Sequence, residues 1–143
     1  MRKILFRGKR IDNGEWLVSR TLLQNSDDER FCWMPVYGDK FGTVEDDKGN
    51  ILRMEYGTLY RVDPVTVGQY IGLKDKNGKR IFEGDIVTRI LFDKPYQYEV
   101  VYRPGYASFD GIRKGGFISF GNDADCFEVI GNIHDNPELM EVR

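Results

Sequence analysis

The chain has 143 residues, of which 41% are hydrophobic and 13% aromatic, a composition typical of a globular protein and not of a disordered one. Its net charge of −2 and its isoelectric point of about 5.5 give no overall attraction to nucleic acid or to an anionic membrane. The basic start has no apolar segment behind it, and no apolar run approaches the length of a membrane span, so we expect a cytoplasmic protein without membrane contact.

The chain opens with the pattern of a β-hairpin. Residues 2–7 alternate polar and apolar side chains and predict a first strand, and residues 15–19 predict its return. Between them lies Asp12-Asn13-Gly14, a strong turn sequence. An N-terminal hairpin is therefore expected.

The next segments predict further short strands around an insertion. Residues 31–37 are strongly apolar, but Pro35 favours an edge strand or an extended segment over a central strand. Residues 38–50 are dominated by glycines and acids, which indicates a mobile insertion, and residues 56–62 resume a strand pattern. We expect residues 1–68 to form an N-terminal β-rich subdomain with a loop insertion.

Residues 69–87 are the densest stretch of structural signals. Asn77-Gly78 suits a hairpin because both residues tolerate positive φ, and Glu83-Gly84-Asp85 is a second glycine-centred reversal. The acidic start of the first turn resembles a calcium loop, but lysines and an arginine occupy positions that a calcium loop needs for oxygen ligands. Two turns that direct strands are the better interpretation.

The rest of the chain predicts more strands. Residues 96–102 form the clearest one, residues 105–116 read as a glycine-rich connection, and residues 117–120 and 126–133 predict two more strands. Asn136-Pro137 resembles a helix start. The expected fold is mainly β, with some α-helix allowed: short antiparallel strands, with residues 69–143 as a small SH3-like barrel whose closure removes exposed sheet edges.

The sequence offers little for catalysis or metal binding. His134 is the only histidine and precedes Asp135, but no nucleophile lies nearby in the sequence, so a surface turn residue is the better interpretation. One histidine without a Cys or His cluster predicts no metal site. Cys32 and Cys126 both lie among apolar residues, so buried thiols are expected. We therefore expect no enzyme, no cofactor and no metal.

The strongest functional signal is an aromatic and basic region over residues 96–114. Alternating tyrosines beside basic residues are what a base-stacking surface requires, but they equally make a packing face or an oligomer interface. The acidic isoelectric point favours packing or self-association. The residues concerned are Tyr96, Tyr98, Tyr102, Arg103, Tyr106, Phe109, Arg113 and Lys114.

Two long motifs resemble the YopX family of phage and prophage proteins. They lie at residues 69–87 and at residues 129–139, and the basic and apolar start at residues 2–7 fits as well. The resemblance implies a mainly β protein with a barrel-like C-terminal part that self-associates. It brings no catalytic residues.

Three functional hypotheses follow. In the first, a non-enzymatic phage accessory protein forms homo-oligomers or captures a host or phage protein, with aromatic anchors that the monomer core explains equally well: Trp16, Phe31, Trp33 and Tyr37. In the second, the 96–114 region binds nucleic acid. The third is an unrecognised hydrolase, which is remote because no nucleophile, base and orienting group appear together.

Overall fold

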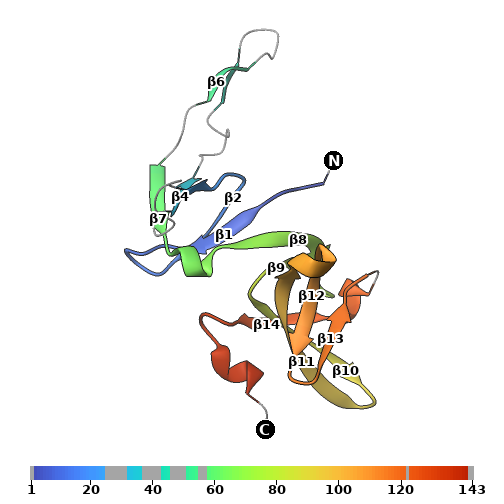
Figure 1. Cartoon of the computed structure of the whole chain (residues 1–143). Helices are drawn as coiled ribbons and strands as arrows, with labels where there is room; N and C mark the ends of the chain where they lie inside the picture. The colour runs from blue at the N-terminus through green and yellow to red at the C-terminus, as the bar shows by residue number, and fades with distance from the viewer. Residues whose placement is uncertain are drawn as a thin grey trace. The chain divides into compact units, whose positions relative to one another are not determined.

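The computed structural model describes residues 2–24, 32–36, 43–45, 51–54, 58–121 and 123–141. The chain divides into two compact units, Leu5–Val67 and Gly68–Arg143 together with Met1–Ile4, and each is described by itself below. The described residues form β-strands and short 3-10 helices and contain no α-helix, which confirms the mainly β class (Figure 1). No helix in the described ranges is long and apolar enough to cross a membrane. The predicted division into subdomains 1–68 and 69–143 stays a prediction.

The first unit begins with the predicted hairpin. Strands β1 (Phe6–Lys9) and β2 (Trp16–Ser19) pair antiparallel, with Phe6 opposite Ser19 and Lys9 opposite Trp16. The side-chain oxygen Oδ1 of Asn13 accepts a hydrogen bond from the backbone N–H of Glu15, which fixes the turn locally. The hairpin prediction is confirmed.

A three-stranded sheet in this unit corrects the position predicted for Pro35. Strand β4 (Cys32–Val36) lies between β3 (Leu23–Gln24) and β7 (Thr58–Val62), so it is central and not an edge strand. The short β3 pairs only with the first two residues of β4, so at Pro35 the strand has a neighbouring strand on one side only. The missing N–H of the proline is tolerated there.

The predicted mobile insertion lies largely outside the described residues. Its described part, Thr43–Glu45 (β5), is a strand that pairs antiparallel with Ile51–Met54 (β6). The unit ends with a 3-10 turn, η1 (Pro64–Thr66), whose start is capped by the side chain of Asp63 on the N–H of Val65.

The second unit contains a β-hairpin and a five-stranded antiparallel sheet. Strands β8 and β9 form one hairpin, and five further strands form a sheet in the order β13-β12-β11-β10-β14. The bounds are β8 (Gly68–Lys74), β9 (Arg80–Phe82), β10 (Asp85–Leu91), β11 (Lys94–Arg103), β12 (Ser108–Arg113), β13 (Gly116–Ser119) and β14 (Glu128–Asn132). The 3-10 turns are η2 (Pro104–Tyr106), η3 (Ala124–Cys126) and η4 (Pro137–Met140).

The five-stranded sheet is open in the described part of the chain. Strands β13 and β14 form its two edges and do not pair with each other. The expected closed, SH3-like barrel is therefore not confirmed, although the antiparallel strands that it required are present. The helix expected at Asn136 is only the single 3-10 turn η4, and the Asn136 side chain accepts a hydrogen bond from the N–H of Asn132 instead of capping it.

Strand β12 (Ser108–Arg113) was not predicted from the sequence. The glycine-rich connection predicted at residues 105–116 contains β12, which pairs with β11 and with β13. Gly111 lies inside this strand, and the position requires a glycine because a Cβ there would be 2.8 Å from Cγ1 of Ile118 and 3.0 Å from Cβ of Tyr98. The glycine allows a close approach between neighbouring strands and does not mark a turn.

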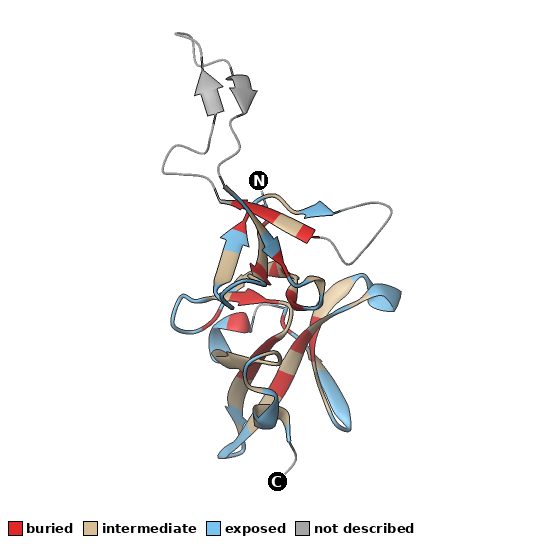
Figure 2. Cartoon of the chain, turned by 90° about the vertical axis from the view of Figure 1, so that its left-hand side faces the viewer, coloured by how far each residue is buried: buried red, intermediate tan, exposed pale blue. Residues whose placement is uncertain are grey.

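The core of the second unit lies on one face of this sheet. It gathers side chains from β9, β10, β11 and the segment around η3. Figure 2 colours the chain by burial, with buried residues in red. The rings of Phe120 and Tyr98 both meet Phe127 edge-on, at centroid distances of 5.3 and 6.2 Å. Because residues three apart share a side of a 3-10 turn, η3 buries Ala124 and Phe127 and leaves Cys126 exposed. The prediction of a buried thiol is correct for Cys32 and wrong for Cys126.

The turn between β8 and β9 is organised by one carboxylate. Asp75 is 5% exposed, and its Oδ1 accepts hydrogen bonds from the N–H groups of Asn77 and Lys79, both at 2.9 Å. Its Oδ2 accepts a third bond of 2.9 Å, from the N–H of Val129 in β14. The hairpin is thus as predicted, but of the expected pair Asn77-Gly78 only Gly78 has positive φ. Asp75 therefore joins the two stretches that carry the family resemblance.

Candidate interaction surface

Strand β11 places its tyrosines on one face, and that face is largely interior. Tyr98 is 5% exposed and Val100 1%, and both belong to the core. Tyr96 is half-buried against this core, whereas Tyr102, near the strand's end, is 46% exposed and packs against Phe109 at a ring distance of 5.2 Å. The alternating tyrosines therefore form a packing face whose exposure rises toward one end.

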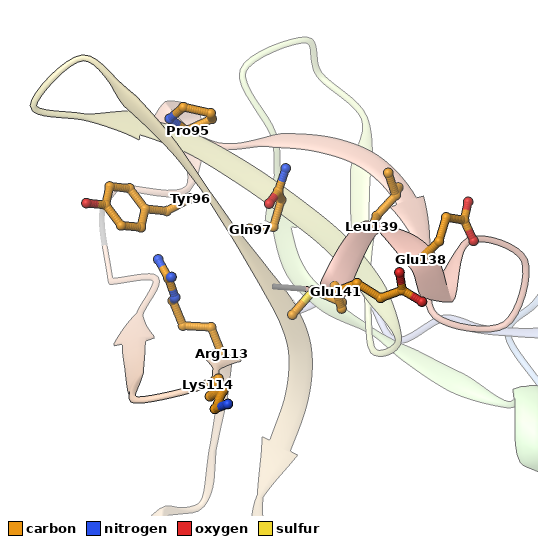
Figure 3. Close-up of a pocket in the computed structure, with 9 residues that line it drawn as sticks. Pro95, Tyr96, Gln97, Arg113, Lys114, Glu138, Leu139 and Glu141 are labelled. Carbon is orange, nitrogen blue, oxygen red and sulfur yellow. The ribbon is translucent and has the colours of Figure 1, made fainter. Parts of the chain in front are cut away.

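Arg113 closes the other end of this face. Its guanidinium lies 4.6 Å from the ring centroid of Tyr96 and 5.9 Å from that of Tyr98. In Figure 3 the Arg113 side chain points toward the Tyr96 ring. A guanidinium held over an aromatic face is a cation–π contact, which orients both side chains. Lys114, the next residue, is exposed.

The opposite face of the sheet carries a second cluster, which we call the Arg103 patch: Arg103, Tyr106, Asp110 and Phe117. The guanidinium of Arg103 lies 4.0 Å from the Tyr106 ring centroid and 4.3 Å from that of Phe117. One of its nitrogens is 3.3 Å from Oδ2 of Asp110, which is 3% exposed and also accepts a bond from the Ser108 hydroxyl. Tyr106 and Phe117 remain 69% and 59% exposed. In this patch the Arg103 guanidinium is held by the ion pair with Asp110, and the two aromatic rings beside it remain exposed.

A pocket of about 460 Å³ lies beside the start of β11. Its walls come from β11, from the end of β12 with the following turn, and from η4, and Figure 3 shows cationic and carboxylate side chains on opposite sides of the β11 ribbon. The lining residues are Pro95, Tyr96, Gln97, Arg113, Lys114, Glu138, Leu139, Met140 and Glu141. The pocket therefore presents apolar area between opposite charges. A second pocket of about 390 Å³ includes Arg2, Ile71, Glu83, Tyr102 and Phe109.

The exposed apolar end of the β10–β11 hairpin was not predicted from the sequence. Phe92 is 92% exposed and Ile90 72%. Because Leu91 pairs with Lys94, the turn consists of Phe92 and Asp93 alone. An apolar residue that directly precedes a turn aspartate was the available signal, but it reads as the last buried residue of a strand.

The predicted tryptophan anchors lie in the first unit. Trp16 is half-buried, with the Arg7 guanidinium 4.9 Å and the Lys9 ammonium 5.9 Å from its ring. Trp33 is half-buried on the central strand β4, opposite Leu23 and Arg61. The other two anchors, Phe31 and Tyr37, lie outside the described residues. Neither tryptophan offers a fully exposed ring.

The carboxyl groups of Asp75 and Glu99, both in the second unit, have shifted pKa values. Burial alone would raise the pKa of Asp75, but the three backbone N–H donors and the nearby Lys79 outweigh it and lower the pKa. Partial burial raises the pKa of Glu99, on β11. In the described ranges no three His, Cys, Asp or Glu side chains gather as a metal site would require. His134 is half-buried in a turn, where its backbone N–H donates a hydrogen bond to Oδ1 of Asn132.

Fold and surface together define a mainly β protein with an open five-stranded sheet and ordered aromatic and basic clusters on it. The family model described as YopX protein matches residues 5–141, so the chain belongs to the YopX protein family. Protein EF1440 from Enterococcus faecalis has a similar crystal structure, with a TM-score of 0.55, 25% sequence identity, and coverage of 96% of this chain and 98% of that one. No curated protein matches the sequence.

Proposed function

We propose that this protein is a non-enzymatic phage or prophage accessory protein that acts in the cytoplasm through protein–protein contacts, including contacts between its own copies. The observation that carries this proposal is the Arg103 patch. Exposed aromatic rings around an arginine are the composition enriched in interface hot spots. The ion pair with Asp110 holds the guanidinium in place, so little side-chain freedom remains to be lost on binding.

The surroundings of the buried Asp75 carboxylate support a structural role and not a catalytic one. The oxygens of Asp75 already accept three backbone hydrogen bonds, and its pKa is lowered. A general base for neutral pH instead needs a pKa near the working pH and access to the substrate proton. Asp75 fits the stabilisation of a turn.

Nucleic-acid binding by the 96–114 region is the alternative, and the stacked pair of Arg113 and Tyr96 supports it. Two features weigh against it. Tyr98 is buried and offers no face to a base, and the carboxylates of Glu138 and Glu141 line the same pocket as the cations and would repel phosphate. A gel-shift titration with single- and double-stranded DNA and RNA at two salt concentrations tests it, because binding by this route is salt-dependent and is weakened in an R113A/K114A variant.

The proposed protein-binding role is tested by affinity capture of the tagged chain from phage-carrying cells. We expect Y106S/F117S to lose partners that the wild type recovers, and V65S, which changes an exposed residue of the first unit, to retain them. Recovery of the same partners by all three would refute a role for the patch. Light scattering at micromolar concentration tests self-association, which a monomeric wild type would contradict.

A further inference from the structure

The turn between β10 and β11 carries a large apolar side chain where a single copy of the chain gains nothing from it. Phe92 and Asp93 have φ values of 52° and 63°, the pattern of a type I′ turn, which favours Asn, Asp and Gly. Phe92 is 92% exposed, so it neither suits its backbone conformation nor packs in its own core. The hairpin end projects beyond the sheet (Figure 1). Exposed apolar groups in unfavourable conformations mark contact sites.

The 460 Å³ pocket is complementary to this turn in its arrangement of apolar and charged side chains. Along the turn, apolar Phe92 is followed by the negative Asp93 and the positive Lys94. In the pocket, apolar lining from Pro95, Tyr96, Leu139 and Met140 lies with Arg113 and Lys114 on one side and Glu138 and Glu141 on the other. Turn and pocket therefore each carry one apolar element with both charge signs beside it.

We propose that two copies of the chain form a two-fold dimer in which Phe92 of each copy occupies this pocket of the other. Asp93 then faces the cations of the partner's pocket, and Lys94 faces its carboxylates. The inference rests on the self-association proposed above and names the surface through which it occurs. Aromatic rings bind well beside a methionine thioether and a tyrosine ring, both of which the pocket supplies.

The position of the pocket on the same hairpin allows the dimer to close. Pro95 lines the pocket and lies only three residues from Phe92, so the inserting and the receiving groups neighbour each other on one chain. A two-fold axis between two such hairpins satisfies both contacts at once, since each copy gives and receives one ring. The same contact made head to tail would leave one turn and one pocket unused.

A reciprocal charge exchange tests the geometry. The variants K94E and E138K change exposed residues, and each alone places like charges together at both contacts of its homodimer, which we expect to weaken it at least about tenfold. An equimolar mixture of the two pairs opposite charges at both contacts and restores a dimer of one copy of each. Sedimentation of separately labelled variants measures this, and a mixture as weak as its components would overturn the proposal.

The variant F92S isolates the inserted ring. We expect it to weaken dimerisation about 30-fold or more, the loss typical of a hot-spot residue, while V65S, which changes an exposed residue of the first unit, leaves the dimer unchanged. Circular dichroism checks that both variants are folded. A wild-type dimer that F92S leaves intact overturns this inference and leaves the proposed self-association standing. A wild-type monomer overturns both, and the affinity capture with Y106S/F117S then still decides the role of the patch.

Discussion

Replacement of Asp75 by asparagine removes the charge that organises the β8–β9 turn. Three backbone N–H groups donate to this carboxylate, from Asn77, Lys79 and Val129. A hydrogen bond to a charged partner contributes about 1.5–3 kcal/mol. An asparagine keeps one acceptor oxygen and turns an NH2 group toward N–H donors, so at least one bond is lost and the others lose their charge. We expect D75N to lower the free energy of unfolding at pH 7 by about 2–4 kcal/mol, a large share of the 5–15 kcal/mol typical of a domain.

Urea unfolding followed by circular dichroism between pH 7 and pH 3 measures this effect, with D93N as the matched control. Asp93 is an exposed turn residue whose positive φ asparagine tolerates, so D93N should change little. Because the folded-state pKa of Asp75 is lowered, its stabilisation is complete above the unfolded value of about 3.9 and is lost as the pH falls through the folded pKa. D75N should lack this acid-dependent loss. A cost below about 0.5 kcal/mol, or parallel pH curves for wild type and D75N, would refute the reasoning.

Three further results are expected from single substitutions. G111A should lower the free energy of unfolding by about 1–3 kcal/mol because its Cβ would meet a neighbouring side chain at 2.8 Å, whereas G105A has open space and should be nearly neutral in the same thermal scans. E99Q should raise the urea midpoint at pH 7 and converge with the wild type at acidic pH. Burial raises the pKa of Glu99 in the folded state, so the wild type loses stability as the pH rises from the unfolded-state pKa of this group through its folded-state pKa. An unchanged midpoint would contradict this. F92N should raise the free energy of unfolding in dilute solution by about 1 kcal/mol, since asparagine tolerates the left-handed conformation, and a lower value would show that the Phe92 ring stabilises the single chain.

The fold class was predictable from the sequence because its signals are local. Strand alternation and turn chemistry act within a few residues, and they identified the β1–β2 hairpin, the β8–β9 hairpin and strand β11. Strand β12 escaped because Gly111 reads as a loop residue until its neighbours in space are known. Barrel closure was a global expectation, and the open sheet shows that strand count alone does not determine it.

The candidate surface was only partly predictable. The spacing of Tyr96, Tyr98 and Tyr102 correctly places them on one face, but which face is buried depends on Phe127, almost 30 residues away. The ring pairs of Arg113 with Tyr96 and of Arg103 with Phe117 depend likewise on strand register across β11, β12 and β13. Phe92 was missed because its local sequence suggests burial, while the turn geometry places it outside.

The bond from Val129 to Asp75 spans 54 positions of the chain, which has a consequence for the order of folding. Chain closure over such a distance is entropically costly and slow compared with hairpin formation. During synthesis the β8–β9 turn emerges well before β14, so its carboxylate remains hydrated until the later strand arrives. The completed turn therefore reports that β14 has docked, and amide exchange at Val129 would follow the last assembly step of this unit rather than the first.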